Sequence, residues 1–325
     1  MGKKHIVGID LGGTKTMVAV LDQKLKVICR EKMRTRGEEG PKATVARMAK
    51  LVQKAFEEGC GKKAKIAYVG VGAPGPLKPG EGVIVAAPNL GWKNVPLKKM
   101  LQAQLNVPVN VDNDVNMGTY GEYIAGAARG KSLVVGLFPG TGIGGGIVID
   151  GRVIQGASGS AGELGHIIVE PHGMLCGCGR RGCIETIASR LSIAKEVAAA
   201  SAKGQTPFIH DRFGTDIDKM KSSAFSDAIA AGDKVVESIV RHAARMLGVA
   251  AGSVVNILSP DCLVIGGGLV EAMPKLFLEE VRQGVKDFGM PAISPYVKVV
   301  TAKLGDDAVA VGAAAYAGKV LKGGK

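Results

Sequence analysis

The stretch Ile6–Leu21, with the sequence IVGIDLGGTKTMVAVL, decides the fold class of this 325-residue chain. β-Branched and apolar residues lie on both sides of a central LGGTK turn, so the pattern predicts two short strands joined as a hairpin. The pattern returns at Leu133–Ile149, LVVGLFPGTGIGGGIVI, where an offset of 128 residues aligns Gly140 with Gly12. Two copies of one strand–turn–strand unit indicate duplicated domains.

Helical and strand-like segments alternate along the rest of the chain. Helical spacing at Ala43–Glu58 precedes a strand-like run at Ala67–Gly72. A long helical segment is expected at Ser222–Leu247, and a helix of small residues at Ala308–Leu321. This alternation predicts an α/β protein. We assign no role to the segment Gly204–Ser223.

The chain is longer than one compact core usually requires, which favours two domains. We expect two related α/β lobes with a cleft between them. The small N-terminal lobe is expected to comprise residues 1–112 and 306–325. The large C-terminal lobe is expected at residues 113–305, with a metal-binding loop at residues 166–185.

The composition is that of a globular protein, with 46% hydrophobic and 22% charged residues. Lys and Arg exceed Asp and Glu by 13, but the lysines are scattered and have few aromatic neighbours. We therefore expect a solvated basic surface and no nucleic-acid binding. The uncharged run Ser132–Ile149 contains Pro139 and six glycines, which argues against a membrane helix. Since no leader peptide is expected either, we predict a cytoplasmic protein that binds no membrane.

Two nucleotide signatures are near misses. The segment Gly8–Thr16 resembles a Walker loop, but Thr14 stands where lysine should follow the second glycine, and a strand follows instead of a helix. The segment Gly140–Gly145 matches G-x-G-x-x-G, but again a strand-like run follows it. The sequence thus argues against both a P-loop and a dinucleotide-binding fold.

The two glycine turns instead predict sites for phosphate groups. Backbone N–H groups in a tight glycine turn form a concave anion site, and glycine permits close approach. Thr14 and Thr141 add hydroxyl donors, and Asp10 at the end of its strand can hold magnesium directly or through water.

A cluster of cysteines predicts a metal site. Cys176, Cys178 and Cys183 follow C-x-C-x₄-C spacing, with His166 and His172 as candidate fourth ligands. Three thiolates and one imidazole suit a tetrahedral structural zinc ion.

A polar run, Val111-Asp-Asn-Asp-Val-Asn116, offers a general base. A carboxylate that accepts the proton of a hydroxyl group would assist the attack of that hydroxyl group on a phosphate group. Asp112 and Asp114 are the two candidates, and a capped helix start near Met117 is the structural alternative.

Taken together, these motifs resemble those of the ROK family of sugar kinases and repressors. Asp10-x-Gly-Gly-Thr-Lys, Gly140-Thr-Gly-x-Gly-Gly-Gly and Gly266-Gly-Gly are similar to phosphate and adenosine elements of the hexokinase and actin-like ATPases. Gly162-Glu-Leu-Gly-His166, followed by the cysteine run, is typical of ROK kinases. The resemblance covers essentially the whole chain and implies a two-lobed actin-like ATPase fold, as in hexokinase, Hsp70 and actin.

The resemblance also implies residue roles. It makes Asp114 the base and His166 the fourth zinc ligand. The implied sugar ligands are Gly75, Asn89, Asn113, Asp114, Glu163, His166 and Glu185. The implied contacts to ATP and its phosphates are Asp10, Gly12, Gly13, Thr14, Lys15, Gly140, Thr141, Gly142, Gly266, Gly267 and Gly268.

The expected activity is transfer of a phosphoryl group from ATP, with magnesium, to the 6-hydroxyl of glucose. N-acetylglucosamine, N-acetylmannosamine and fructose are alternative substrates, and the basic charge leaves inorganic polyphosphate open as a donor. The resemblance implies a homodimer. The alternatives from other classes are a ROK repressor, whose additional helix-turn-helix domain we do not expect here, and a sugar-binding protein without catalysis.

Overall fold

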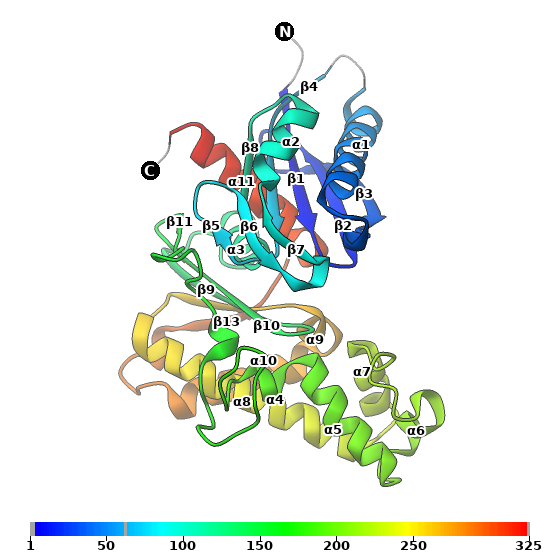
Figure 1. The fold of residues 1–325 in the computed structure, drawn as a ribbon. Coiled ribbons are helices and arrows are strands. Elements are labelled where there is room, and N and C mark those ends of the chain that lie inside the picture. The colour runs from blue at the N-terminus through cyan, green and yellow to red at the C-terminus, as the bar shows by residue number, and fades with distance from the viewer. Residues whose placement is uncertain (1–3, 62–63, 324–325) are drawn as a thin grey trace. The chain divides into compact units, whose positions relative to one another are not determined.

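The structure is a computed structural model that describes residues 4–61 and 64–323. The chain divides into two compact units (Figure 1). Unit 1 comprises Met1–Val134, Gly146–Gly162 and Lys303–Lys325, and unit 2 comprises Val135–Gly145 and Glu163–Ala302. Unlike the expected small lobe, unit 1 also includes residues 113–134 and 146–162, because the helix that begins at Asp114 packs on the C-terminal helix. The predicted lobe boundaries stay a prediction.

Unit 1 contains a five-stranded sheet in the order β3-β2-β1-β4-β8. Its strands are β1 (Lys4–Leu11), β2 (Lys15–Leu21), β3 (Val27–Arg34), β4 (Lys65–Ala73) and β8 (Val109–Asn113). The first three strands are antiparallel neighbours, while β1, β4 and β8 run parallel. Asp10 pairs with Gly72, and Gly72 pairs with Asp112, so the carboxyl ends of three parallel strands meet at one edge. In α/β sheets this edge is where ligands bind.

Helices cover both faces of this sheet. Helices α1 (Pro41–Cys60) and α2 (Leu97–Leu105) bury their apolar sides against one face, in a core that includes Val7 and Ile9. Helix α11 (Ala308–Leu321) covers the other face, beside α3 (Asp114–Ile124). Because side chains alternate along a strand, Asp10 shares the α11 face with Gly8. A small sheet of β5 (Leu77–Lys78), β6 (Val83–Ala87) and β7 (Trp92–Val95) completes the unit.

Glycines let α11 approach its neighbours closely. A Cβ atom at Gly8 would lie 1.9 Å from the Ala310 carbonyl oxygen, so the helix backbone rests directly on β1. On α3, a Cβ atom at Gly121 would lie 2.2 Å from the Ala308 carbonyl oxygen, whereas one at Gly118 would meet only Val309 Cγ2 at 3.6 Å. The α3–α11 contact therefore requires glycine at position 121 and tolerates alanine at position 118.

We expect Gly121→Ala to destabilise unit 1 by about 2 kcal/mol, because overpacking outweighs the gain in helix propensity. The matched variant Gly118→Ala is expected to be neutral or to stabilise by up to about 1 kcal/mol. Urea denaturation followed by circular dichroism measures both. Equal stabilities of the two variants would contradict the close packing of α3 on α11.

A second five-stranded sheet has the order β11-β10-β9-β12-β13. Its strands are β9 (Leu133–Pro139), β10 (Ile143–Ile149), β11 (Arg152–Val153), β12 (Cys262–Ile265) and β13 (Lys298–Thr301). The helices of unit 2 are α4 (Glu185–Ala188), α5 (Arg190–Ala202), α6 (Pro207–Phe213), α7 (Ser222–Ala230), α8 (Lys234–Leu258), α9 (Gly268–Ala272) and α10 (Pro274–Phe288). The second glycine turn joins β9 to β10, so both predicted hairpins are present.

The segment Ser222–Leu247 is helical as expected, but a break at residues 231–233 divides it into two helices. Gly232 has a φ of 89° and ends α7, and the Asp233 carboxylate then caps α8 by accepting hydrogen bonds from Val235 N and Val236 N. Helix α8 continues to Leu258. The segment Gly204–Ser223 contains α6, where Arg212 lies over the Phe208 ring at 3.8 Å from its centroid.

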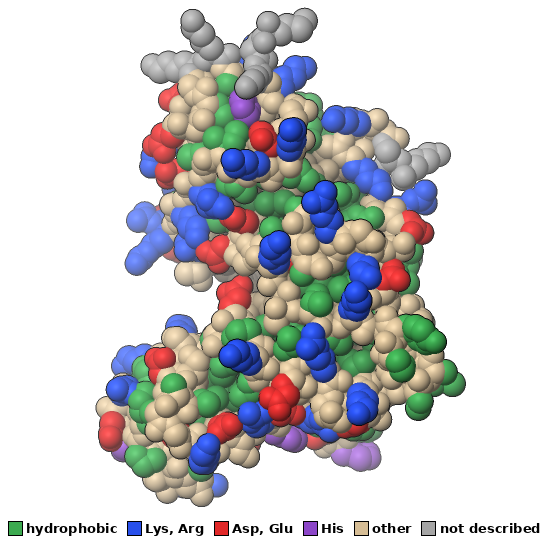
Figure 2. Space-filling model, turned by 180° about the vertical axis from the view of Figure 1, so that it is seen from behind, with side chains coloured by type: hydrophobic (Ala, Val, Ile, Leu, Met, Phe, Trp, Pro, Cys, Tyr) green, Lys and Arg blue, Asp and Glu red, His purple; other side chains and the backbone are tan. Residues whose placement is uncertain are grey.

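Basic side chains are dispersed over the face shown in Figure 2 and form no continuous patch there, as expected from the scattered lysines. No helix within residues 4–61 or 64–323 combines the length and apolar character needed to cross a membrane.

Candidate active site and metal centre

In unit 1, the turn after Asp10 is held by a residue that the sequence motifs did not indicate. Gly12 N donates to Lys15 O at 3.0 Å, which closes the turn. The buried Thr35 hydroxyl donates to Gly12 O at 2.7 Å and lies 2.9 Å from the Thr16 hydroxyl. Thr14 and Lys15 are exposed. The turn is thus fixed by the buried Thr35, while Thr14 and Lys15 remain accessible to solvent.

Asp10 lies in an acidic environment. Burial, followed by the negative charges of Asp114 and Asp306, raises the pKa of Asp10 to about 7, and Lys32 opposes this. Lys32 is engaged by Asp306, with Nζ 2.6 Å from Oδ2. A carboxyl group whose pKa is raised in this way favours a nearby cation, because a cation stabilises its ionised form. Asp10 thus has the surroundings expected of a magnesium ligand.

Asn113 and Asp114 lie where β8 passes into α3. Asn113 is the N-cap of α3, and its Oδ1 accepts a hydrogen bond from Asn116 N at 3.0 Å. Asp114 is the first helical residue, where the helix dipole favours a negative charge, and its Oδ1 accepts from Val115 N at 2.9 Å. Both side chains are partly exposed. The N-cap and the first residue of α3 are therefore also the two candidate catalytic residues, Asn113 and Asp114.

The other predicted sugar ligands of unit 1 lie beside these elements. A Cβ atom at Gly75 would be 3.5 Å from Asn113 Nδ2, so Gly75 and Asn113 are neighbours. A Cβ atom at Gly13 would be 2.9 Å from Asn89 Cβ, so the first glycine turn abuts Asn89. Unit 1 therefore brings its predicted phosphate and sugar residues together.

Asp112, the second candidate base, is buried and fully engaged. Its Oδ1 accepts from Asn113 N at 2.7 Å and from Asn116 Nδ2 at 3.3 Å, and its Oδ2 accepts from Gln155 Nε2 at 2.6 Å. Burial raises the pKa of Asp112, and these three hydrogen bonds oppose the rise. The geometry suits a residue that orders the β8–α3 turn, whereas Asp114 is partly exposed. Gln155 was missed, because no motif marks it.

In unit 2, the second glycine turn is also closed by its backbone. Gly140 N donates to Gly142 O at 2.8 Å, and Thr141 at the tip is exposed. The third glycine motif lies next to it: Gly266 N donates to Leu137 O at 3.1 Å, and Gly267 has a φ of 82° beside Pro139 O. The structure thus gathers the predicted nucleotide residues of unit 2 in one place.

The predicted metal ligands also come together in unit 2. One ligand atom each from His166, Cys176, Cys178 and Cys183 lies within 4.8 Å of the others. The Sγ atoms of Cys178 and Cys183 are 3.6 Å apart, and Cys176 Sγ is 3.7 Å from His166 Nδ1. Ligands about 2.3 Å from a tetrahedral zinc ion lie about 3.8 Å apart, so the donor set fits such an ion. His172, the rival ligand, is exposed and outside the cluster.

Two of the three thiols of this cluster, those of Cys176 and Cys183, are buried, whereas Cys178 is exposed. Burial raises the pKa of Cys183 to about 12 and also raises the pKa of Cys176. Thiols in this state are neutral near pH 7, and metal coordination would deprotonate them. The cluster can therefore hold a metal ion.

Three predicted sugar ligands lie in or beside the cluster. His166 presents Nδ1 to Cys176, and its Nε2 lies 3.9 Å from the exposed Glu163 carboxylate. Glu185 Oε1 lies 3.9 Å from Cys176 Sγ. A metal bound by His166 Nδ1 would leave Nε2 available to a ligand.

The family model for ROK matches residues 6–320. The chain belongs to the ROK family. The glucokinase of Halalkalibacterium halodurans is 34% identical to it over 96% of the chain and 94% of that protein. The xylose repressor of Caldicellulosiruptor bescii is 30% identical over 94% of the chain and 76% of that protein. A ROK family glucokinase from Streptomyces griseus, solved in complex with glucose and AMPPNP, is 31% identical with a TM-score of 0.83, covering 97% of this chain and 99% of that one.

The resemblance stated from the motifs is thus confirmed. The mixed α/β architecture and the ROK structures confirm the two-lobed actin-like ATPase fold, and the relatives named glucokinase support the predicted enzyme class, a hexose kinase.

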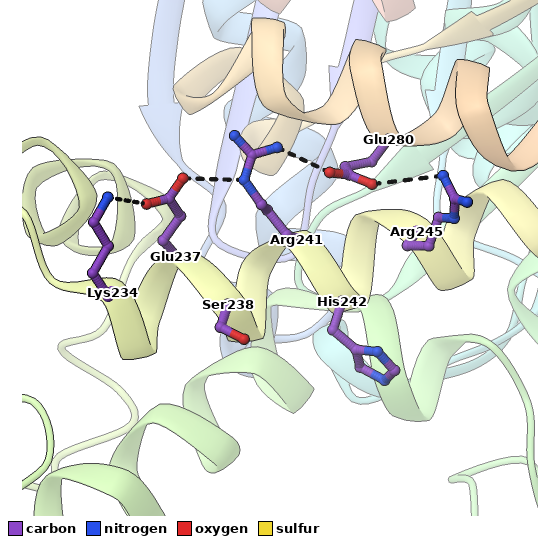
Figure 3. A pocket seen from close by; sticks show the side chains of 7 residues that line it. All are labelled: Lys234, Glu237, Ser238, Arg241, His242, Arg245 and Glu280. Carbon is purple, nitrogen blue, oxygen red and sulfur yellow. Dashed lines mark hydrogen bonds and ion pairs between the residues drawn. The ribbon is translucent and has the colours of Figure 1, made fainter.

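A separate pocket of about 460 Å³ lies along α8 and α10 and contains none of the predicted site residues (Figure 3). Its arginines are already paired with carboxylates: Arg241 contacts Glu237 at 3.1 Å and Glu280 at 2.9 Å. Surface ion pairs of this kind do not indicate a binding site.

Proposed function

We propose that this ROK protein is a hexose kinase that transfers the γ-phosphoryl group of ATP to the 6-hydroxyl of glucose, giving glucose 6-phosphate and ADP. The observation that carries the proposal is the placement of Asp114 at the start of α3, with Asn113 beside it. Asp10 lies near enough to Asp114 for the Asp114 charge to raise the pKa of Asp10. A general base, a neighbouring amide and a cation ligand at one sheet edge suit phosphoryl transfer to a hydroxyl group.

In this proposal Asp114 accepts the proton of the 6-hydroxyl, because a neutral hydroxyl is a poor nucleophile. The residues proposed to bind sugar hydroxyls are Gly75, Asn89, Asn113, Glu163, His166 and Glu185. The backbone N–H groups of the glycine turns stabilise the charge on the transferring phosphates. Asp10 would hold magnesium, which supplies neutralisation of phosphate charge when bound.

The Cys₃His cluster would hold a structural zinc ion, which keeps the 166–185 loop ordered when bound. The residues fit this role because their ligand atoms lie within 4.8 Å of one another and the protein buries Cys176 and Cys183. His166 Nε2 would then be oriented toward a sugar hydroxyl. We further propose that the enzyme acts in the cytoplasm as a homodimer.

A coupled assay of ADP release across a sugar panel tests the substrate. We expect glucose to give the highest kcat/KM, above fructose, N-acetylglucosamine and N-acetylmannosamine. The phosphoryl donor is tested by replacing ATP with inorganic polyphosphate in the same panel and quantifying the sugar phosphate directly. We expect ATP to be the preferred donor. Equal kcat/KM for N-acetylated sugars and glucose would contradict glucose as the substrate while leaving the kinase activity in place.

A further inference from the structure

The turn at residues 140–143, called the phosphate turn below, is held by the segment that follows the cysteine cluster. Ile143 N donates a hydrogen bond to Glu185 Oε2 at 2.8 Å, and Arg190 N donates to Gly140 O at 2.8 Å. One contact orients a backbone N–H group of the turn and the other a carbonyl group. Both partners lie at the start of α4 and α5, so the turn depends on a segment about 45 residues further along the chain.

The packing at the phosphate turn leaves little freedom. A Cβ atom at Gly142 would lie 2.5 Å from Glu185 Oε2, so the carboxylate lies against the backbone of the turn. From the other side, a Cβ atom at Gly165 would lie 2.2 Å from Ile143 O. Gly165 immediately precedes the metal-binding loop and Glu185 is its last residue, so residues at both ends of the loop contact the turn.

The two oxygens of Glu185 face different partners. Oε2 accepts the hydrogen bond from Ile143 N, while Oε1 lies 3.9 Å from Cys176 Sγ. One side chain thus contacts both the phosphate turn and the cysteine cluster. A hydrogen bond to a charged acceptor is stronger than a neutral one and fixes its donor more firmly.

We propose that Glu185 is a positioning residue for the nucleotide phosphates, in addition to its proposed contact with the sugar. By accepting the Ile143 N–H group, Glu185 holds the phosphate turn in the conformation that binds ATP. The inference rests on the proposed function, since it takes residues 140–142 to bind phosphate. It adds a second role to the sugar contact that the family resemblance implies for Glu185.

A negative carboxylate next to a phosphate site repels the phosphate charge. The contribution of this charge and that of the hydrogen bond to Ile143 N can be tested separately with three variants. Glu185→Gln removes the charge but retains an oxygen that can accept the Ile143 N–H group. Glu185→Asp retains the charge but shortens the side chain by one methylene group, so the carboxylate can no longer accept the hydrogen bond from Ile143 N. Glu185→Ala removes both.

The test is the affinity for magnesium-AMPPNP in the absence of sugar, measured by isothermal titration calorimetry, with melting temperatures as a check of folding. We expect Glu185→Ala and Glu185→Asp to weaken AMPPNP binding about tenfold, and Glu185→Gln to stay within about twofold of the wild type. The matched control Glu163→Gln changes another proposed sugar ligand that has no contact with the turn. It should weaken glucose binding and leave AMPPNP binding unchanged.

Two results would overturn the inference. One is wild-type AMPPNP affinity in both Glu185→Ala and Glu185→Asp, and the other is a Glu185→Gln variant as weak as Glu185→Ala. If the wild-type protein itself binds no AMPPNP, the proposed function fails and the inference with it, and this outcome is recognised without any variant.

Discussion

Replacing Asp114 with Asn is expected to lower kcat about 10³-fold while glucose affinity stays within about threefold of the wild type. The amide is nearly isosteric with the carboxylate and can still hydrogen-bond to a sugar, but it cannot accept the proton of the 6-hydroxyl. Steady-state kinetics gives kcat, and glucose binding followed by tryptophan fluorescence or calorimetry gives the affinity.

Asp112→Asn is the matched variant for this prediction, because Asp112 is the other carboxylate of the same run. Both of its oxygens already accept hydrogen bonds from protein groups, so we expect a smaller loss of kcat, about tenfold, from a less ordered turn. A larger loss for Asp112→Asn than for Asp114→Asn would reverse the assignment of the base.

The second large effect is expected at the metal centre. Replacing the buried Cys183 with Ser is expected to reduce bound zinc from one equivalent to none and to lower the melting temperature by roughly 10 °C, because metal binding contributes to folding. The glucose affinity should fall with it, since His166 and Glu185 lie in or beside the cluster. Elemental analysis by mass spectrometry and a thermal melt measure the two effects.

Cys29→Ser and His172→Ala are the controls for the metal centre. Cys29 is another free cysteine outside the cluster, and His172 is the exposed rival ligand. Both variants should retain one equivalent of zinc. Loss of zinc from His172→Ala, or its retention by Cys183→Ser, would refute the proposed ligand set.

Local patterns predicted much of the fold. Helix α11 has the bounds expected from the sequence, Ala308–Leu321. Both hairpins formed where strand periodicity and glycines predicted them. The break between α7 and α8 was missed although a signal existed, since Gly followed by Asp at positions 232 and 233 is a typical helix end and N-cap.

Several features of the site depend on contacts between distant residues and have no sequence signal. Thr35 fixes the first glycine turn from 23 residues away, and Gln155 bonds Asp112 from 43 residues away. Glu122 is buried and accepts hydrogen bonds from the backbone N–H groups of Ala127, Lys303 and Leu304, which holds the chain where it re-enters unit 1. Isolated Thr, Gln and Glu residues are usually solvated, so only the tertiary structure reveals these roles.

The clustering of the metal ligands, in contrast, follows from short-range spacing. Cys176, Cys178 and Cys183 lie within eight residues of one another, and His166 precedes Cys176 by 10 residues. The choice of His166 came from the family resemblance, although His172 is nearer to the cysteines in the sequence.

The measurement that tests the central claim most directly is identification of the product by ³¹P NMR after incubation with glucose, ATP and magnesium. The account predicts equal amounts of ADP and glucose 6-phosphate with the wild-type protein, and about 10³-fold slower formation of glucose 6-phosphate with Asp114→Asn. A wild-type protein that binds glucose but forms no phosphorylated sugar, with glucose or with any other hexose, would contradict it.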